Sequence, residues 1–542
     1  MRIPRALVAL PVTLILGLTL GGPTAVADPP APPGSKASPA GIDHRAAQAE
    51  EALANVEAII AGHADRSGSH GPSRDYTLAL NELIKLKDAL TGADKERAIQ
   101  ILARPGQPGD DYIPGALPHV TCGPEICVHY TETGGNAAKG SDGDPATIPT
   151  YITQVLNTLE KINTDYVAAG YRTPKRDGGI GGGTNKVDIY IGNIGNQGLY
   201  GFCTSDDPHN PTDPDGNPDT NDPDDYSFWA YCALDNDYAK DEFPTNTPIE
   251  NMRVTAAHEY FHAVQYAYDA FEDGWILEST ATWVEDEMFD DVNDNRYYLP
   301  NSPLKAPHIP VDTYGDNFHY GTWIWWRYLT EKFPAKTGML PKLVLDVWKR
   351  LDGAPGGPDR YSTQGLSQVL AGRGTTIKKE LQQFFGVNRH PRTYYEEGSA
   401  YKASPTALTL NYSGAQRKGA YSKPRHMSSN TVKLNPKGLS QRDWKLRLSF
   451  NAPDTARGGA FVVIVHKSGG GLSTSLVRLN TNGGGSKTVP FSSANIDHVD
   501  VLFVNTSTRF KCWQSNTSPY SCLGTPKDDR LRSEFSGKAF RS

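Results

Sequence analysis

The stretch that most constrains how this chain folds is VTAAHEYFHAVQYAY, residues 254–268. Its side chains are uncharged apart from His258, Glu259 and His262, so the helix that it predicts cannot form a solvated face. Burying these three groups without partners would be costly, and a shared metal ion is the economical solution. The alternative is a pair of core histidines satisfied by backbone carbonyls and tyrosine hydroxyls.

The spacing of the two histidines favours the metal. Positions i and i+4 of a helix lie on one face, so His258 and His262 can offer two imidazole nitrogens to one ion. The pattern H-E-x-x-H is typical of zinc peptidases, in which the glutamate, here Glu259, is the general base. The bare motif also arises by chance, in roughly one or two per hundred chains of this histidine content. The residues around it therefore determine how strongly it indicates a metal site.

Such a site needs a third protein ligand, because catalytic zinc holds three and keeps one position open. The segment GWILESTATWVEDEMF, residues 274–289, follows a glycine turn and has helical periodicity. Glu278 lies at its start, where the chain can turn it back toward the histidines, and the small Ala281 allows close approach. Glu278 is therefore the predicted ligand. Rival carboxylates are Asp269, Glu272, Asp273 and Glu285.

Together these residues resemble the gluzincins, the zinc metallopeptidases that include thermolysin-like and aminopeptidase-like enzymes. The similarity rests on the H-E-x-x-H helix and a later helix reading E-x-x-A, and it covers about 30 residues. It implies a zincin-like fold in which His258, His262 and Glu278 bind zinc. Glu259 would then take a proton from the zinc-activated water and pass it to the leaving amine. Fifteen residues separate His262 from Glu278, fewer than in the best-known families, so the subfamily and the specificity stay open.

The developing oxyanion needs a second donor besides zinc. Gluzincins commonly use a downstream tyrosine or histidine, and TYGDNFHYGTWIWW, residues 313–326, offers Tyr314, His319 and Tyr320. Tyr320, which directly precedes a glycine and an aromatic helix, most resembles the family arrangement and is the predicted donor. The alternative is that these aromatic side chains only pack.

The N-terminus has the pattern of a secretory signal peptide over residues 1–27. Two arginines precede an apolar run at residues 6–20, and Ala25 and Ala27 form an A-x-A cleavage pattern. The run is short for a membrane anchor and contains a proline. We therefore expect cleavage, secretion and no membrane contact of the mature protein.

Six cysteines fit an exported protein. In an oxidising compartment their spacing predicts three local disulfides, Cys122–Cys127, Cys203–Cys232 and Cys512–Cys522. A thiolate metal site is the alternative, and the lack of any C-x-x-C pair disfavours it.

The periodicity changes along the chain, which predicts an α+β fold in several domains. Residues 28–115 carry helical segments and a linker, and are interpreted either as a removable pro-region or as a permanent helical domain. Residues 116–400 begin with strands and continue as mainly helical segments, the expected zincin-like metallopeptidase domain with a mainly helical lower part. Residues 405–542 contain short strands between Gly, Asn and Pro turns, which predicts a β-sandwich domain.

The segment between the second pair of cysteines is strongly acidic. Asp213, Asp215, Asp219 and Asp222, together with Gly216, imitate the spacing of a calcium loop. A proline occupies the first ligand position of a full EF-hand loop, no glutamate closes it, and no helices flank it. Calcium binding and a solvated, disulfide-closed acidic loop are both left open.

Charge and composition narrow the function. A formal net charge of −7 is small for 542 residues and gives no support to a nucleic-acid partner. The leading hypothesis is a secreted zinc peptidase that acts on protein or peptide substrates. One alternative is an exported surface- or polysaccharide-binding protein with an inactive core, against which the intact Glu259 argues. The other is a zinc hydrolase of non-peptide substrates.

Overall fold

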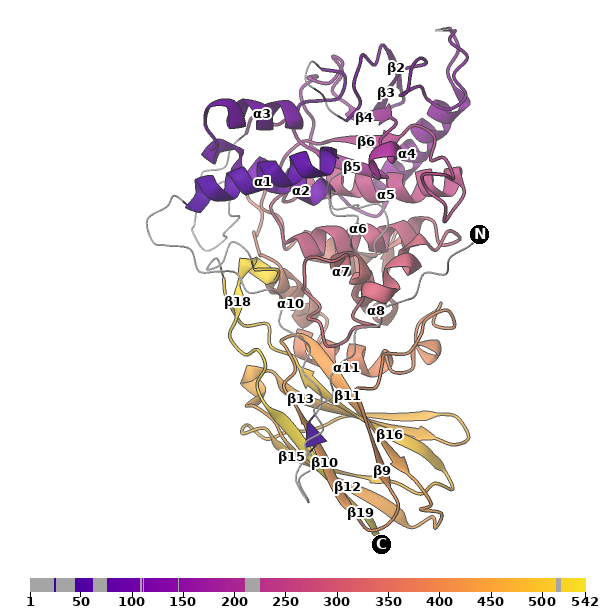
Figure 1. Cartoon of the computed structure of the whole chain (residues 1–542), viewed down its shortest axis with the longest axis vertical. Helices are drawn as coiled ribbons and strands as arrows, with labels where there is room; N and C mark the ends of the chain where they lie inside the picture. Colours follow the sequence, from indigo (N-terminus) through magenta and orange to yellow (C-terminus); the bar gives the residue numbers. More distant parts are fainter. Residues whose placement is uncertain are drawn as a thin grey trace, which may run out of the picture.

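The computed structural model describes residues 24–25, 44–61, 76–107, 110, 112–144, 146–209, 225–512 and 518–542. Along the long axis, three helices and a mixed sheet lie at one end, helices fill the middle, and an all-β part forms the other end (Figure 1). The predicted α+β class is therefore confirmed. The acidic loop with Asp213, Asp215, Asp219 and Asp222 lies outside the described residues, as does the predicted signal peptide except for the short strand β1 (Thr24–Ala25).

The N-terminal helices are α1 (His44–Ile60), α2 (Tyr76–Leu86) and α3 (Gly92–Leu102). Leu80, Leu83 and Ile84 of α2 are buried in the same hydrophobic core as the mixed sheet and the helix that carries H-E-x-x-H. Tyr76 adds edge-on ring contacts to Phe202 of the sheet. The helical segment thus packs onto the main body rather than folding as a separate unit.

The mixed sheet has the order β2-β3-β4-β6-β5. Its strands are β2 (His119–Cys122), β3 (Ile126–Tyr130), β4 (Val187–Gly192), β6 (Tyr231–Asp235) and β5 (Gly201–Thr204). The three central strands are parallel and almost wholly buried, as expected of strands covered on both faces. Both edge strands run antiparallel to their neighbours. The edge strand β5 lies beside the candidate site.

Two long helices pack with this sheet. Helix α4 (Thr150–Ala168) connects β3 to β4 and buries one apolar face, as its periodicity predicts. Helix α5 (Pro248–Tyr266) begins with Pro248 at its first turn and with a capping box in which Thr247 and Glu250 satisfy each other's backbone amides. From Val254 onward every residue of α5 is buried, which is why its sequence carries no solvated face.

The middle part is helical and begins with α6 (Gly274–Met288), which packs on α5. It continues with α7 (Phe318–Gly321), α8 (Trp323–Lys332), α9 (Lys342–Trp348), α10 (Thr363–Gly372), α11 (Ile377–Val387) and the short strands β7 (Lys336–Thr337) and β8 (Leu340–Pro341). Short 3-10 segments are η1 (Lys87–Ala89), η2 (Gly195–Gln197), η4 (Asp294–Asn301), η5 (Pro391–Thr393), η6 (Thr455–Arg457) and η7 (Ser521–Leu523). None of the described helices is long and apolar enough to span a bilayer.

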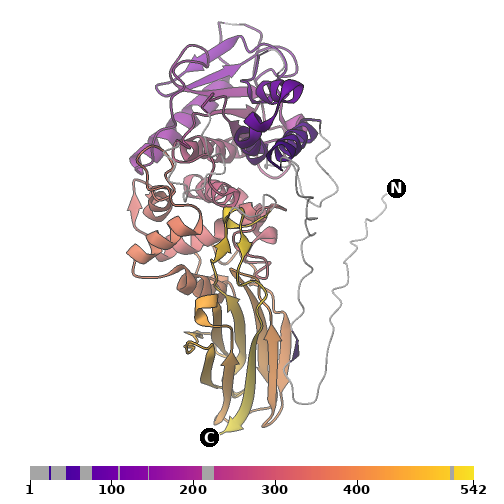
Figure 2. The same ribbon diagram turned by 90° about the vertical axis from the view of Figure 1, so that its left-hand side faces the viewer.

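The C-terminal part is a sandwich of two five-stranded sheets, as predicted (Figure 2). One sheet has the order β1-β10-β19-β12-β15, with β10 (Arg417–Ser422), β19 (Ser533–Arg541), β12 (Trp444–Asn451) and β15 (Gly484–Pro490). The other has the order β14-β13-β16-β11-β9, with β14 (Leu472–Leu476), β13 (Gly459–Lys467), β16 (Ile496–Asn505), β11 (Ser428–Pro436) and β9 (Leu408–Tyr412). A separate ribbon pairs β17 (Phe510–Lys511) with β18 (Thr525–Pro526).

Strands β13 and β16 of the second sheet are largely buried on both faces. Val463 and Val501 point into the sandwich core, whereas Val462, Ile464 and Leu502 belong to the core shared with the helices. Helix α11 packs against β13 and β16 on this outer face. The sandwich is therefore joined to the helical part by a continuous apolar interface.

A buried ion pair reinforces this junction and gives it a pH dependence. His426 Nε2 lies 3.0 Å from Asp312 Oδ1, and its Nδ1 lies 3.1 Å from Asp529 Oδ1. Burial alone would lower the pKa of His426, but Asp312 and Asp529 outweigh it and raise the pKa to about 8. The folded state therefore holds this proton more tightly than the unfolded chain does. The stabilisation is complete below the unfolded pKa near 6.5 and is lost as pH rises through about 8.

We expect this pair to contribute about 2 kcal/mol to the free energy of unfolding at pH 6. His426→Gln should remove that contribution at pH 6 and cost much less at pH 9, where the native histidine is neutral. Urea unfolding of wild type and variant at both pH values measures the difference. An equal loss of stability at pH 6 and pH 9 would contradict the prediction.

The three predicted disulfides are confirmed: Cys122–Cys127, Cys203–Cys232 and Cys512–Cys522. Cys203 and Cys232 are direct cross-strand partners on β5 and β6, so this bond ties the edge strand to the sheet. Disulfides of this kind fit an oxidising compartment.

Candidate metal centre

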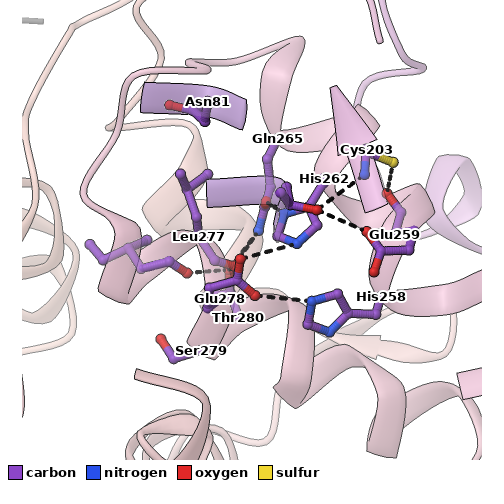
Figure 3. A network of polar contacts seen from close by, with 12 residues as sticks. Asn81, Cys203, His258, Glu259, His262, Gln265, Leu277, Glu278, Ser279 and Thr280 are labelled. Carbon is purple, nitrogen blue, oxygen red and sulfur yellow. Dashed lines mark hydrogen bonds and ion pairs between the residues drawn. The ribbon is translucent and has the colours of Figure 1, made fainter. Parts of the chain in front are cut away.

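The predicted ligands come together between α5 and α6 (Figure 3). The Glu278 carboxylate faces both histidines, with Oε2 at 3.0 Å from His258 Nε2 and Oε1 at 3.6 Å from His262 Nε2. One ligand atom from each residue lies within 4.8 Å of the others. The helical spacing of the motif and the start of α6 thus bring two imidazoles and one carboxylate to a single point.

Partners on the far side of each ring hold the imidazoles in place. His258 Nδ1 lies 2.6 Å from Glu285 Oε1, and His262 Nδ1 lies 2.7 Å from Gln265 Oε1. Gln265 is itself fixed, because its amide nitrogen donates to the Leu277 carbonyl. When Nδ1 carries the proton and donates it to these oxygens, the lone pair on Nε2 points toward Glu278.

The residues fit a cation in their midst. The side chains of His262 and Glu278 are 1% and 0% exposed. His262 Nε2 and Glu278 Oε1 make no hydrogen bond within the described part of the chain. Leaving a buried acceptor unsatisfied is costly, and an ion bound by both atoms removes that cost. Two imidazoles and a glutamate are also a donor set of catalytic zinc sites.

Electrostatics favour positive charge at this point. Burial alone would lower the pKa of His258, but its hydrogen bonds to Glu278 and Glu285 raise the pKa to about 10. Burial alone would raise the pKa of Glu278, but His262 and His258 hold it well below its usual range. The cluster therefore stabilises a proton between His258 and Glu278, and a divalent cation would take the place of that proton.

Glu259 lies in the same turn of α5 and faces the N-terminal helices. Thr77 Oγ1 on α2 donates to Glu259 Oε2 at 3.3 Å and accepts from the Cys203 backbone N–H on β5 at 3.1 Å. Gly201 allows this close packing, because a Cβ there would lie 2.8 Å from Glu259 Cγ. Glu259 is only 2% exposed, so α2 and β5 together cover the predicted base.

The predicted oxyanion donor lies next to the histidines. Tyr320 on α7 is fully buried, and its ring centroid lies 6.0 Å from that of His258. Its ring also stacks on Tyr298 at 4.9 Å. His319 is buried and accepts a hydrogen bond from the Gly315 N–H through Nδ1, whereas Tyr314 is 42% exposed. The ring of Tyr320 therefore lies beside His258, and its role as oxyanion donor stays a prediction.

The rival carboxylates have other partners. Asp269 accepts from the Phe271 N–H, Glu272 from the Ser362 N–H and Asp273 from the Cys522 N–H, so each stabilises a turn or a junction. Glu285 does reach His258, but at the nitrogen opposite the one that faces Glu278.

Gln265 and Thr77 were not singled out from the sequence, and Glu285 was named only as a rival for the third ligand. Gln265 follows His262 by three positions and Glu285 follows Glu278 by seven, so helix periodicity places Gln265 on the face of His262 and Glu285 on the face of Glu278. That spacing could have suggested both orienting roles. Thr77 has no comparable signal, because 182 residues separate it from Glu259.

Comparisons with known proteins leave the family of this chain open. No family model matches it, and no curated protein matches it. Among solved structures, the pre-peptidase C-terminal domain of a collagenase from Bacillus anthracis matches with 8% identity and a TM-score of 0.14, over 25% of this chain and 97% of that one. A family 16 carbohydrate-binding module matches with 13% identity and a TM-score of 0.12, over 24% of this chain and 73% of that one.

Proposed function

We propose that this chain is a secreted zinc-dependent peptidase of the gluzincin type. The observation that carries the proposal is the convergence of His258 Nε2, His262 Nε2 and the Glu278 carboxylate, with two of these atoms buried and lacking a hydrogen bond within the described residues. Glu259, on the same turn of α5, supplies a general base beside them. The three disulfides support export.

Each residue would then have a distinct task. His258, His262 and Glu278 would hold the ion, while Glu285 and Gln265 orient the imidazoles. Zinc in such a site supplies a Lewis acid that lowers the pKa of water and polarises a carbonyl group. Glu259 would accept a proton at its carboxylate and deliver it to the leaving amine. The Tyr320 hydroxyl would donate to the oxygen that becomes negative.

The edge strand β5 is where we place an extended peptide substrate. Cys203 forms a close cross-strand pair with Cys232, with Cα atoms 4.1 Å apart, as in the pairs of an antiparallel ladder that exchange no backbone hydrogen bonds. Its N–H therefore points away from β6, and in this structure it meets Thr77 instead. Outward N–H and C=O groups of an edge strand bind peptides by adding a strand.

The occupant of that edge, α2, supports the pro-region interpretation of residues 28–115. Thr77 is hydrogen-bonded both to the outward N–H of β5 and to the carboxylate of Glu259. These are the two groups that a substrate complex would need. We therefore propose that the described state is the latent form and that displacing α1–α3 opens the site.

The proposal is tested by zinc content and proteolysis of the secreted chain. We expect about one tightly bound zinc ion at this site and hydrolysis of casein after limited proteolysis of the N-terminal segment. A chelator should abolish the hydrolysis and added zinc should restore it. Zinc binding without hydrolysis of any peptide, after the N-terminal segment has been removed, would refute the peptidase and leave a metal-binding core.

Glu278→Ala should weaken zinc binding more than a substitution of a residue that only contacts one of the ligands. It removes a ligand, whereas Glu285→Gln only alters the partner of His258 and should cost about 10–100-fold in affinity. Competition with a zinc indicator dye measures both variants. If the Glu278→Ala variant binds zinc as tightly as the wild type, another carboxylate is the third ligand.

A further inference from the structure

A second set of two histidines and a carboxylate lies in the β-sandwich, on the sheet that packs against the helices. His466 on β13 and His498 on β16 are cross-strand partners, and Asp500 follows His498 by two positions. Residues two apart in a strand point to the same face, so all three side chains share one face of the sheet. One ligand atom from each lies within 4.8 Å of the others.

Both imidazoles direct Nε2 toward the same carboxylate. His466 Nε2 lies 3.1 Å from Asp500 Oδ2, and His498 Nε2 lies 3.7 Å from Asp500 Oδ1. The two rings stack with their centroids 3.8 Å apart. On the other side of its ring, His498 Nδ1 lies 2.5 Å from Asp497 Oδ2. A carboxylate that accepts the Nδ1 proton leaves Nε2 with a lone pair, as in the second shell of metal sites.

Only one oxygen of Asp500 is satisfied. Oδ2 accepts from Arg389 Nε at 2.9 Å, and the same guanidinium donates to Thr406 Oγ1. Oδ1 makes no hydrogen bond within the described residues, although the Asp500 side chain is 0% exposed. Arg389 thus fixes the carboxylate and leaves a buried acceptor beside two imidazoles, the arrangement found at Glu278 in the first site. Such an acceptor is costly unless a cation or another donor satisfies it.

The histidines keep a path to solvent. Their side chains are 15% and 12% exposed, whereas the carboxylate beneath them is buried. A cation can therefore enter from outside and reach the carboxylate between the rings. Coordination by both Nε2 atoms would require the stacked rings to tilt apart.

We propose that His466, His498 and Asp500 form a second transition-metal site, which takes zinc or another imidazole-preferring divalent ion. Two imidazoles and a carboxylate suit Zn²⁺, Co²⁺ and Ni²⁺, whereas Ca²⁺ and Mg²⁺ prefer oxygen ligands alone. This site, the junction site, lies where Arg389, two residues after the end of α11, binds the sandwich through Asp500. A bound ion would therefore cross-link β13 and β16 beside the contact between Arg389 and Asp500.

Zinc stoichiometry of the full-length chain tests this site separately from the first one. After removal of metal with a chelator and reloading with zinc alone, the wild type should hold about two ions per chain and the His466→Ala/His498→Ala double variant about one. Glu278→Ala should also hold about one, and the triple variant none. His119→Ala, a half-buried histidine outside both sets, is the matched control and should match the wild type.

The outcomes separate the two proposals. If the wild type holds one ion and only the double variant loses it, the junction site is supported and the proposal of a zinc peptidase is refuted. If the double variant binds as much zinc as the wild type, the junction site is overturned. Cobalt loaded into Glu278→Ala gives an independent readout, because its visible absorption should vanish when His466 and His498 are also replaced. Persistence of that absorption would equally overturn the site.

Discussion

Replacing Glu259 with glutamine is expected to reduce kcat for casein or peptide hydrolysis by roughly 10²–10⁴-fold, the usual contribution of a general base. The amide has the shape of the carboxylate and can still accept the hydrogen bond of Thr77 through its carbonyl oxygen. It cannot take up a proton at neutral pH. Because Glu259 is not among the three converging ligands, zinc content should remain that of the wild type.

The control for this experiment lies on the same helix. Glu250→Gln makes the same chemical change nine residues earlier in α5, at the capping box, where glutamine also satisfies the pattern. It should leave both kcat and zinc content unchanged. Full activity of Glu259→Gln would remove Glu259 from the mechanism, and loss of zinc from it would make this residue part of the metal shell instead.

The part of the site that lies within one helix could be predicted from the sequence. H-E-x-x-H needed only the helical period to place His258 and His262 on one face, and the absence of charge around them predicted their burial. Glu278 was predictable because α6 follows α5 after a short turn, which limits where its first residues can lie. The positions of the histidines and of Glu278 could thus be predicted from local periodicity and from a short connection between two helices.

Contacts between distant segments could not be predicted in the same way. Thr77 reaches Glu259 across 182 residues, and the Cys522 N–H donates to the Asp273 carboxylate, just before α6, across 249 residues. Both contacts depend on how whole layers pack, and no local pattern encodes that packing. The sequence therefore predicted the candidate ligands and base but not the helix that covers them.

The β-sandwich shows the same limit on a larger scale. Strands with alternating burial, such as β12, were predicted because their apolar residues recur with period two. The C-terminal strand β19 carries no comparably clear alternation, although it pairs with both β10 and β12 in the centre of its sheet. Short polar side chains such as Ser533 and Ser536 weaken the alternation in β19. Its place is set by its neighbours rather than by its own composition.

Thr77→Asp is expected to raise the activity of the full-length chain. The new carboxylate would lie beside Glu259 in a buried position, at a site where a hydroxyl now donates a hydrogen bond. Burying two carboxylates against each other costs on the order of 3 kcal/mol. Each 1.4 kcal/mol is about a factor of ten in an equilibrium, so the fraction of molecules with α2 displaced should rise roughly 100-fold.

Two matched changes separate displacement of α2 from general destabilisation. Thr77→Val keeps the shape of the side chain and removes only its hydrogen bonds, so it should raise activity far less than Thr77→Asp. Glu82→Asp lies on the exposed side of the same helix and should change nothing. The measurement is the initial rate of peptide hydrolysis by each intact chain. Its ratio to the rate after proteolytic removal of the N-terminal segment gives the fraction of molecules in which α2 is displaced.

Removing the N-terminal segment should also erase the differences among these variants. All variants are then the same protein from β2 onward, so they should cleave at one rate, and an added peptide of residues 76–107 should inhibit that rate. The Thr77→Asp form of the peptide should inhibit far less. If Thr77→Asp lowers the activity of the full-length chain while the protein remains folded, α2 supports the general base rather than blocking it. The permanent-domain interpretation of residues 28–115 would then be the correct one.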